Sequence, residues 1–184
     1  MKRTSFAGMQ CSLARGLELI GDWWTPLIVR DLFLGLSRFE ELIEDLGLSR
    51  NLLSARLRSL EKGGIIARYP YQERPRRYAY RLSAAGLELV PVLVALTAWG
   101  DRWARPREGR PIVFRHAKCG KTFSPAIVCA ECHEPLETAA IEAMAGPGAR
   151  ARRGTRIIGK FLTNRRPEGG GVEPVTTRAR SMMS

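Results

Sequence analysis

The spacing of apolar side chains predicts four short amphipathic helices in the first third of the chain. Their expected ranges are 10–20, 25–35, 38–47 and 49–64. In the last of them, Leu53, Leu57 and Leu60 form an apolar stripe. Thr25 is expected to be the N-cap of the second helix, because Pro26 follows it at the first helical position. A glycine at or just beyond the end of each range marks where the helix stops.

A change of pattern after residue 64 predicts a β-hairpin and then a long helix. The runs 65–71 and 76–83 together contain two isoleucines and four tyrosines, and the turn-rich sequence QERP separates them. Ser83 is expected to cap the long helix, which contains Pro91. Apolar residues cover more than one face of this helix, so we expect a second molecule to cover part of it.

The order of these elements is that of a winged helix-turn-helix. Only Gly47 and Leu48 join the third and fourth helices, and an arginine-rich hairpin follows. The expected fold class is therefore mainly α with a small β-hairpin wing (α+β). The major groove of B-DNA admits one α-helix, and Arg and Asn side chains pair there with guanine and adenine edges. Arg50 and Asn51 are accordingly expected to contact bases.

Other polar and basic residues are expected to contact the DNA backbone. On the fourth helix and its cap these are Ser49, Ser54 and Arg58, which suit phosphates or groove edges. At the tip of the hairpin they are Arg74, Arg76 and Arg77, which suit the neighbouring backbone or the minor groove. The alternative is a solvated basic helix face in an unrelated helical bundle.

Composition adds a strong positive charge to this picture. The 184 residues include 30 Lys and Arg against 18 Asp and Glu, a formal net charge of +12. Such an excess favours a polyanionic partner such as double-stranded DNA. Only two histidines are present, and no nucleophile–base pair, phosphate-binding loop or catalytic metal set is recognisable, so we expect no enzymatic activity.

The sequence also bears on the compartment. No stretch approaches 18 consecutive apolar residues, and the start MKRTSFAGMQC precedes an amphipathic segment instead of the apolar core of a signal peptide. We therefore expect a cytoplasmic protein with no membrane partner. Four cysteines in a reducing compartment are expected to be reduced, metal-bound or redox-active, not joined in a disulfide framework.

Four residues beyond the winged helix have the spacing of zinc ligands. His116 and Cys119 form one pair and Cys129 and Cys132 another, with nine residues between the pairs. Such pairs can place four donors on one tetrahedral Zn²⁺, so we expect a small zinc-ribbon-like segment with one structural zinc and no other cofactor. His133 adjoins Cys132 and would have to turn back to serve as the fourth ligand. The alternatives are reduced structural thiols or a redox pair of Cys129 and Cys132.

The chain is expected to have three parts. These are a winged-helix DNA-binding and dimerisation domain over 1–105, the Cys- and His-containing extension over 106–145, and a basic tail over 146–184 that is partly disordered, largely so over 164–184. The tail either adds non-specific phosphate contacts or only improves solubility. Its basic residues include Arg150, Arg152, Arg153, Arg156, Lys160, Arg165 and Arg166.

Several ordered pieces of residues 10–105 resemble the HxlR-type winged-helix transcription regulators, relatives of the MarR group. They are Cys11, IGDWWTPLIVRDLFLG, RFEELIEDLGLSRNLLSARLRSLEKGGII, YQERPRRYAYRLSAAGLELVPVL and Trp99-Gly100. A departure is Gly21-Asp22-Trp23-Trp24, where the family typically has Gly-Gly-Lys-Trp. A subgroup with a Cys-rich C-terminal extension is similar further along, although it often has Cys-Gly-His at Cys119-Gly120-Lys121.

The resemblance implies a dimeric DNA-binding regulator whose protomers pair through the first and last helices of the winged-helix unit. The candidate interface residues are Leu13, Leu17, Val90, Leu93, Val94, Leu96 and Trp99. It also implies two interpretations of Cys11. A cysteine at this position senses oxidants or electrophiles in several similar proteins, which requires an accessible thiolate that Arg15 would favour. The alternative is a small apolar residue packed beside the dimer interface.

The function that follows is sequence-specific transcriptional regulation by a homodimer bound to an inverted-repeat operator. The alternative is an RNA-binding or protein-interaction module that uses the Cys-rich segment and the basic tail. Phe114, Phe123 and Phe161 are scattered there and form no stacking platform for unpaired bases, which disfavours RNA. The sequence indicates no particular small-molecule effector.

Overall fold

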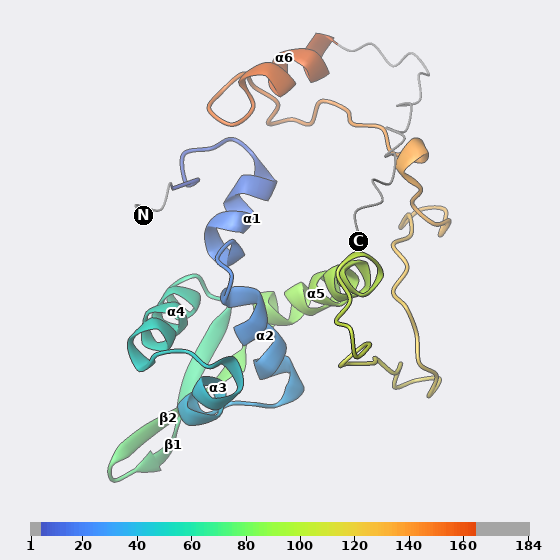
Figure 1. The fold of residues 1–184 in the computed structure, drawn as a ribbon. Coiled ribbons are helices and arrows are strands. Elements are labelled where there is room, and N and C mark those ends of the chain that lie inside the picture. The colour runs from blue at the N-terminus through green and yellow to red at the C-terminus, as the bar shows by residue number, and fades with distance from the viewer. Residues whose placement is uncertain (1–4, 165–184) are drawn as a thin grey trace, which may run out of the picture. The chain divides into compact units, whose positions relative to one another are not determined.

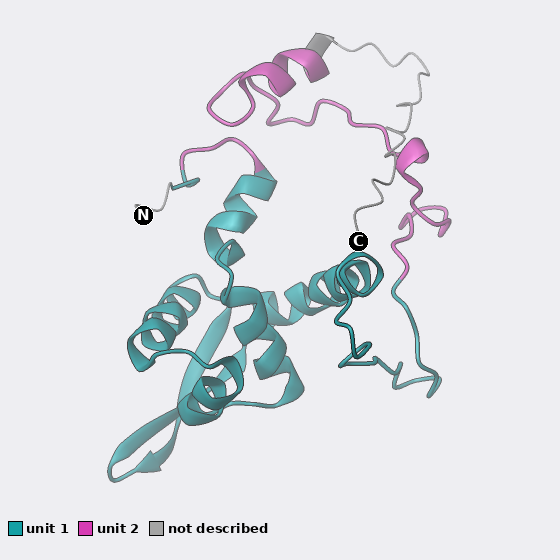
Figure 2. Ribbon diagram, in the orientation of Figure 1, with its two compact units in different colours: residues 1–7, 12–125 teal, residues 8–11, 126–184 magenta. Residues whose placement is uncertain are grey.

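The computed structural model describes residues 5–164, and these form two compact units (Figure 2). Within the described range, unit 1 comprises 5–7 and 12–125, and unit 2 comprises 8–11 and 126–164. The expected disorder of 164–184 falls, apart from residue 164, outside the described residues.

Unit 1 contains the predicted order of four helices, a hairpin and a long helix (Figure 1). Its elements are α1 (Ser12–Ile20), α2 (Thr25–Leu34), α3 (Phe39–Leu46), α4 (Arg50–Lys62), β1 (Ile66–Glu73), β2 (Arg76–Leu82) and α5 (Ala84–Trp103). The mainly α fold with a hairpin wing is therefore confirmed. The expected caps of α4 and α5 are also confirmed, since Ser49 Oγ accepts from Leu52 N–H at 3.3 Å and Ser83 Oγ from Gly86 N–H at 3.2 Å.

The hydrophobic core of unit 1 lies between α2, α3, α4 and the base of the hairpin. The fully or almost fully buried apolar residues are Ile28, Val29, Leu42, Leu48, Leu53, Leu57, Leu60, Ile65 and Ile66. The predicted stripe of α4 thus faces inward, and its polar face is left for solvent or a partner. Arg30 further links the helices, because its Nη2 lies 2.6 Å from Asp31 Oδ1 on α2 and 3.0 Å from Asp45 Oδ2 on α3.

The start of α2 differs from the prediction that Thr25 is its N-cap. Thr25 is the first helical residue, Trp24 is the N-cap, and Trp24 makes no side-chain capping bond. Asp22 provides the capping hydrogen bonds instead. Its Oδ1 accepts from the N–H groups of Trp24 and Thr25 at 3.0 and 3.1 Å, and its Oδ2 accepts from the Thr25 hydroxyl. A carboxylate satisfies these otherwise unpaired donors and suits the positive end of the helix dipole better than a hydroxyl does.

The same carboxylate also connects α2 to α4. Asp22 Oδ1 lies 3.3 Å from Nε of Arg56, and only 10% of the Asp22 side chain is exposed. We expect Asp22→Ala to lower the free energy of unfolding by about 2–3 kcal/mol, because buried donors and a guanidinium lose their acceptor. Urea unfolding measures this change. Asp45→Ala is the control, since its carboxylate is 46% exposed and its loss should cost about 0.2–1 kcal/mol; equal losses would show that Asp22 has no special role.

The turn between α3 and α4 has the geometry that a helix-turn-helix needs. Gly47 ends α3 with φ of 63°, a left-handed conformation that glycine adopts without steric cost. At the other end of α3, Glu41 Oε2 accepts from the N–H groups of Ser37 and Arg38 at 2.9 and 2.8 Å. These N–H groups, first that of Arg38 and then that of Ser37, hold the pKa of Glu41 below its ordinary value. Both ends of α3 are therefore fixed locally.

The hairpin is antiparallel, and its root is joined closely to α5. Ile66 pairs with Leu82 at the root and Glu73 with Arg76 at the tip, with an irregularity between Pro70 and Gln72. Ser83 N–H donates to the Ile65 carbonyl oxygen at 2.9 Å. Gly86 is buried against that same oxygen, which would lie 2.3 Å from a Cβ atom at this position. The first turn of α5 therefore approaches the root of the wing in a way that only glycine permits.

Unit 2 contains little regular structure. A 3-10 helix spans Thr138–Ala140, and α6 spans Arg156–Asn164. The basic tail expected over 146–184 contains α6, whose apolar Ile157, Ile158 and Phe161 recur at intervals of one turn or less. The glycine- and arginine-rich surroundings obscured this short pattern. Among the described residues of unit 2, only Gly159 is buried, so this unit has no apolar core.

Candidate DNA-binding surface

The exposed face of α4 carries several of the residues predicted to contact DNA. Asn51 and Arg58 are exposed and lie two turns apart on this helix, with the half-buried Ser54 between them. Ser49 is exposed at the cap. A polar face of this kind, opposite the buried leucines, is free to enter a groove.

Arg50 occupies a different environment from its neighbour Asn51. Its Nη2 lies 2.9 Å from Glu40 Oε1, and its guanidinium carbon lies 5.2 Å from the centre of the Phe39 ring. Both partners belong to α3. The side chains of Arg50 and Glu40 are 69% and 64% exposed, so their ion pair contributes at most about 1 kcal/mol to the stability of the fold. A phosphate or a guanine can therefore replace Glu40 as the partner of Arg50. The pair holds Arg50 beside the turn of the helix-turn-helix in the absence of DNA.

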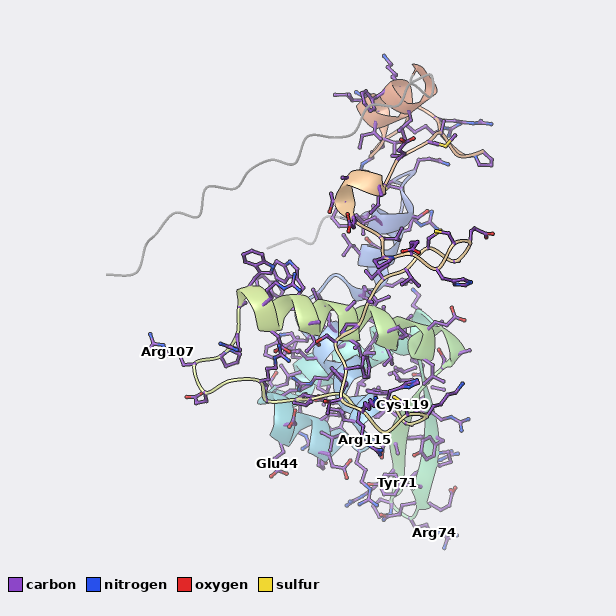
Figure 3. All side chains as sticks on the ribbon, turned by 90° about the vertical axis from the view of Figure 1, so that its right-hand side faces the viewer. Glu44, Tyr71, Arg74, Arg107, Arg115 and Cys119 are labelled. Atoms are coloured by element: carbon purple, nitrogen blue, oxygen red, sulfur yellow. The ribbon has the colours of Figure 1, made fainter. Side chains whose placement is uncertain are left out.

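The hairpin places its arginines at the free end of the wing. Arg74, Arg76 and Arg77 are all exposed, and Figure 3 shows Arg74 at the end of the hairpin, with Tyr71 further along it. The Arg76 guanidinium carbon lies 5.5 Å from the centre of the Tyr78 ring. None of the three arginines forms an ion pair among the described residues, so their charges are available to phosphates.

Further arginines beside the wing were missed in the sequence. Arg38 precedes α3, forms a β-bridge with Ala79 of β2, and lies 5.0 Å from the centre of the Tyr71 ring. Arg81 lies 5.6 Å from the Tyr69 ring in the same way. The alternation of arginine and tyrosine along both strands was a usable signal, because residues two apart share one face of a strand. The strands alone, however, did not place Arg38 beside them.

The first and last helices of unit 1 leave large apolar residues exposed. On α5, Trp99 is 59% and Trp103 71% exposed, and on α1, Leu13 is 72% exposed. Among the candidate interface residues, Val90, Leu93 and Val94 are half-buried, and Leu93 packs against the core. By length and composition, α5 is also long and apolar enough to cross a membrane, a test that helices of soluble proteins pass as well.

A cavity of about 230 Å³ lies between α2 and α5. Its walls are almost wholly apolar, and the side chains of Val29, Phe33, Leu93, Leu96 and Phe114 are among those that line it. Arg30 is the single charged residue in its lining. Its position beside α5 explains why Leu93 is only half-buried.

The predicted zinc ligands occur in two tight turns, one in each unit. Cys129 is half-buried, whereas Cys119 and Cys132 are exposed. Backbone N–H groups of Cys132 and Glu131, together with the Cys132 side chain, hold the pKa of the Cys129 thiol below its ordinary value. Within residues 5–164, no three His, Cys, Asp or Glu side chains lie together in a way that suits a metal ion. The zinc site stays a prediction.

Cys11 directly precedes α1 and is half-buried. Arg15, expected to favour its thiolate, donates from Nη1 to the carbonyl oxygen of Ala7 at 3.3 Å. Sensing of oxidants by Cys11 stays a prediction.

Known proteins resemble this chain in both sequence and structure. Rv3095, an uncharacterized HTH-type transcriptional regulator of Mycobacterium tuberculosis, is 41% identical over 141 residues, 77% of this chain and 89% of the relative. The crystal structure of PA1607, a proposed transcription factor, has a TM-score of 0.69 at 33% identity, covering 78% of this chain and 100% of that one. PA1374 of Pseudomonas aeruginosa has a TM-score of 0.53 at 37% identity, covering 74% and 93%.

The matched regions include more than the winged helix. A match of 141 residues in a chain of 184 contains both Cys-bearing turns wherever it begins, so the likeness to Rv3095 extends through them. The model of the HxlR-like helix-turn-helix family matches residues 19–108, from the end of α1 to just beyond α5. With its exposed α4 face and arginine-bearing wing, the chain belongs to the HxlR-like helix-turn-helix family of transcriptional regulators.

Proposed function

We propose that the protein regulates transcription as a homodimer that binds an inverted-repeat operator in double-stranded DNA. The observation that carries this proposal is the exposed polar face of α4 beside a wing that ends in Arg74, Arg76 and Arg77. A helix in the major groove and a basic hairpin against the flanking backbone are the contacts of winged-helix proteins. The net charge of +12 favours the same partner.

The exposed apolar residues of α1 and α5 support the homodimer. Soluble monomers rarely expose so many large apolar side chains together, and a second copy of the same surface would cover them. This explanation of α5 also requires no membrane, in keeping with a cytoplasmic regulator. Two protomers related by a twofold axis present two α4 helices, which fit half-sites about 34–36 Å apart, one turn of B-DNA.

Selection of binding sites from random double-stranded DNA by the full-length protein tests this function. The expected product is an inverted repeat whose half-sites are about one helical turn apart. Enrichment of a single half-site without its repeat would contradict the dimer on its operator. A pool that shows no enrichment over the starting DNA, combined with tight binding to single-stranded RNA, would favour the alternative RNA-binding function.

A further inference from the structure

The apolar cavity between α2 and α5 is a space that the proposed DNA contacts do not use. Its volume is about 230 Å³. Phe33 and Leu34, which line it at the end of α2, are 46% and 51% exposed, so the cavity can be reached from solvent on that side. An apolar cavity of about 150 Å³ already binds benzene in preference to water. The cavity between α2 and α5 is therefore large enough for an apolar molecule of about two rings.

One wall of the cavity comes from the segment that follows α5. Phe114 of this segment is half-buried, and the centre of its ring lies 6.5 Å from that of Phe123. An ion pair holds the segment to the helix, because Nε of Arg110 lies 3.5 Å from Oδ2 of Asp101 on α5. The match to the family model ends at residue 108, before this wall. The closed cavity thus depends on residues that follow the winged helix.

Arg30 is the charged residue in the walls, and two carboxylates already balance its charge. Its Nε and Nη2 lie 2.7 and 2.6 Å from Asp31 Oδ1, and its Nη2 lies 3.0 Å from Asp45 Oδ2. Its Nη1 forms no hydrogen bond or ion pair with any residue of 5–164. Two carboxylates beside one guanidinium disfavour an anionic ligand, whereas an uncharged acceptor oxygen can still accept a hydrogen bond from Nη1.

The cavity and the exposed tryptophans lie on opposite faces of α5. An α-helix has about 3.6 residues per turn, so Val90, Val94 and Thr97, which line the cavity, share one face. Trp99 and Trp103 lie roughly half a turn away from them. A second protomer that covers the tryptophans therefore leaves the cavity free. Since residues of one protomer form its walls, a small molecule suits it better than a protein partner does.

We propose that this cavity binds a small uncharged molecule of about two fused rings, with one hydrogen-bond acceptor that faces Arg30. Burial of the rings against the apolar walls supplies the affinity, and the hydrogen bond from Nη1 of Arg30 sets the orientation. The bound molecule also covers the exposed apolar surface of Phe33 and Leu34. This site goes beyond the proposed function, because it requires neither DNA nor a second protomer.

Equilibrium dialysis of the full-length protein against 2-acetylnaphthalene tests the proposal. We expect about one bound molecule per chain with a dissociation constant in the micromolar range. Val90→Phe fills part of the cavity and should lower the affinity at least about 10-fold, because less of the ligand is then buried. Val92→Phe is the matched control, since Val92 is 56% exposed, lies outside the cavity walls and should leave binding unchanged.

Two results of the dialysis would overturn the proposal. The first is a wild type that binds no 2-acetylnaphthalene, as expected if another part of the chain or a second copy fills the cavity. The second is equal binding by Val90→Phe and Val92→Phe, which would place the ligand elsewhere on the apolar surface. Circular dichroism and thermal unfolding of each variant separate loss of the site from loss of the fold.

The contact with Arg30 is tested with a second ligand, 2-ethylnaphthalene, which has a similar shape and no acceptor oxygen. Arg30→Lys keeps a positive charge beside Asp31 and removes the guanidinium nitrogen that has no partner among residues 5–164. It should weaken binding of 2-acetylnaphthalene roughly 5- to 10-fold and leave binding of 2-ethylnaphthalene unchanged. An equal effect on both ligands would overturn the hydrogen bond to Arg30 and the class of ligand inferred from it.

Discussion

Asn51→Ala is expected to remove the preference for one base pair in each half-site, at a cost of about 1–3 kcal/mol, roughly 5- to 150-fold in affinity. Asn51 is exposed on α4, so its replacement leaves the core intact. The side chain is uncharged, and its loss removes hydrogen bonds to a base edge without changing the attraction between protein and phosphates. Binding to random DNA should therefore be unchanged. Titrations of operator and random duplexes at one salt concentration measure the difference.

Arg58→Ala and Arg77→Ala are the controls for this prediction. Each removes a charge from an exposed position, on α4 and on the wing respectively. Each substitution should lower the affinity for operator and for random DNA by a similar factor. Each should also lower the salt dependence of binding by about one released ion. If Asn51→Ala instead weakens both kinds of DNA equally, Asn51 does not read bases.

Trp99→Asp is expected to raise the dissociation constant of the dimer by at least about 100-fold, which corresponds to about 2.7 kcal/mol. Trp99 is 59% exposed on α5, so the carboxylate remains hydrated in a single protomer and becomes buried only when two protomers associate. Leu93→Asp would not separate loss of the dimer from unfolding of the protomer, because Leu93 packs against the core. Sedimentation over a range of protein concentrations measures the dissociation constant.

Met144→Asp is the matched control, because it places the same charge at an exposed apolar position outside α1 and α5. Met144 is 74% exposed, and its replacement should leave the dimer unchanged. Operator affinity should fall with Trp99→Asp, since each separate protomer binds only one half-site. If the dissociation constant of the dimer is the same in Trp99→Asp as in the wild type, this part of α5 does not belong to the interface.

The fold of unit 1 could be predicted because nearly all of its local signals agreed with the final packing. The leucine stripe of α4, the caps Ser49 and Ser83, and the turn residues between the strands all specify the same arrangement. The start of α2 was misassigned because two residues could cap it. Thr25 has the usual capping side chain, but Asp22 reaches the same N–H groups and also pairs with Arg56, a contact between elements that local sequence does not show.

The candidate site was less accessible from sequence than the fold. Helical spacing identified the exposed face of α4, but the position of Arg38 depends on its bridge to Ala79, which is 41 residues away in the chain. The partial burial of Leu93 also depends on tertiary packing, because an apolar residue on a broadly apolar helix can face either its own core or a partner. Spacing indicated four candidate zinc ligands, and a zinc site at these residues stays a prediction.

The contact of α5 with the root of the wing has a mechanical consequence. Ser83 bonds to the Ile65 carbonyl, and Gly86 leaves no room between that carbonyl and the first turn of α5, so the wing and α5 move as one lever. The eight residues of β1 make the wing an arm about 26 Å long, and a tilt of about 5° displaces its tip by roughly 2.3 Å. A small rotation between two protomers at α5 therefore reaches the arginines of the wing as a shift comparable to the length of a hydrogen bond.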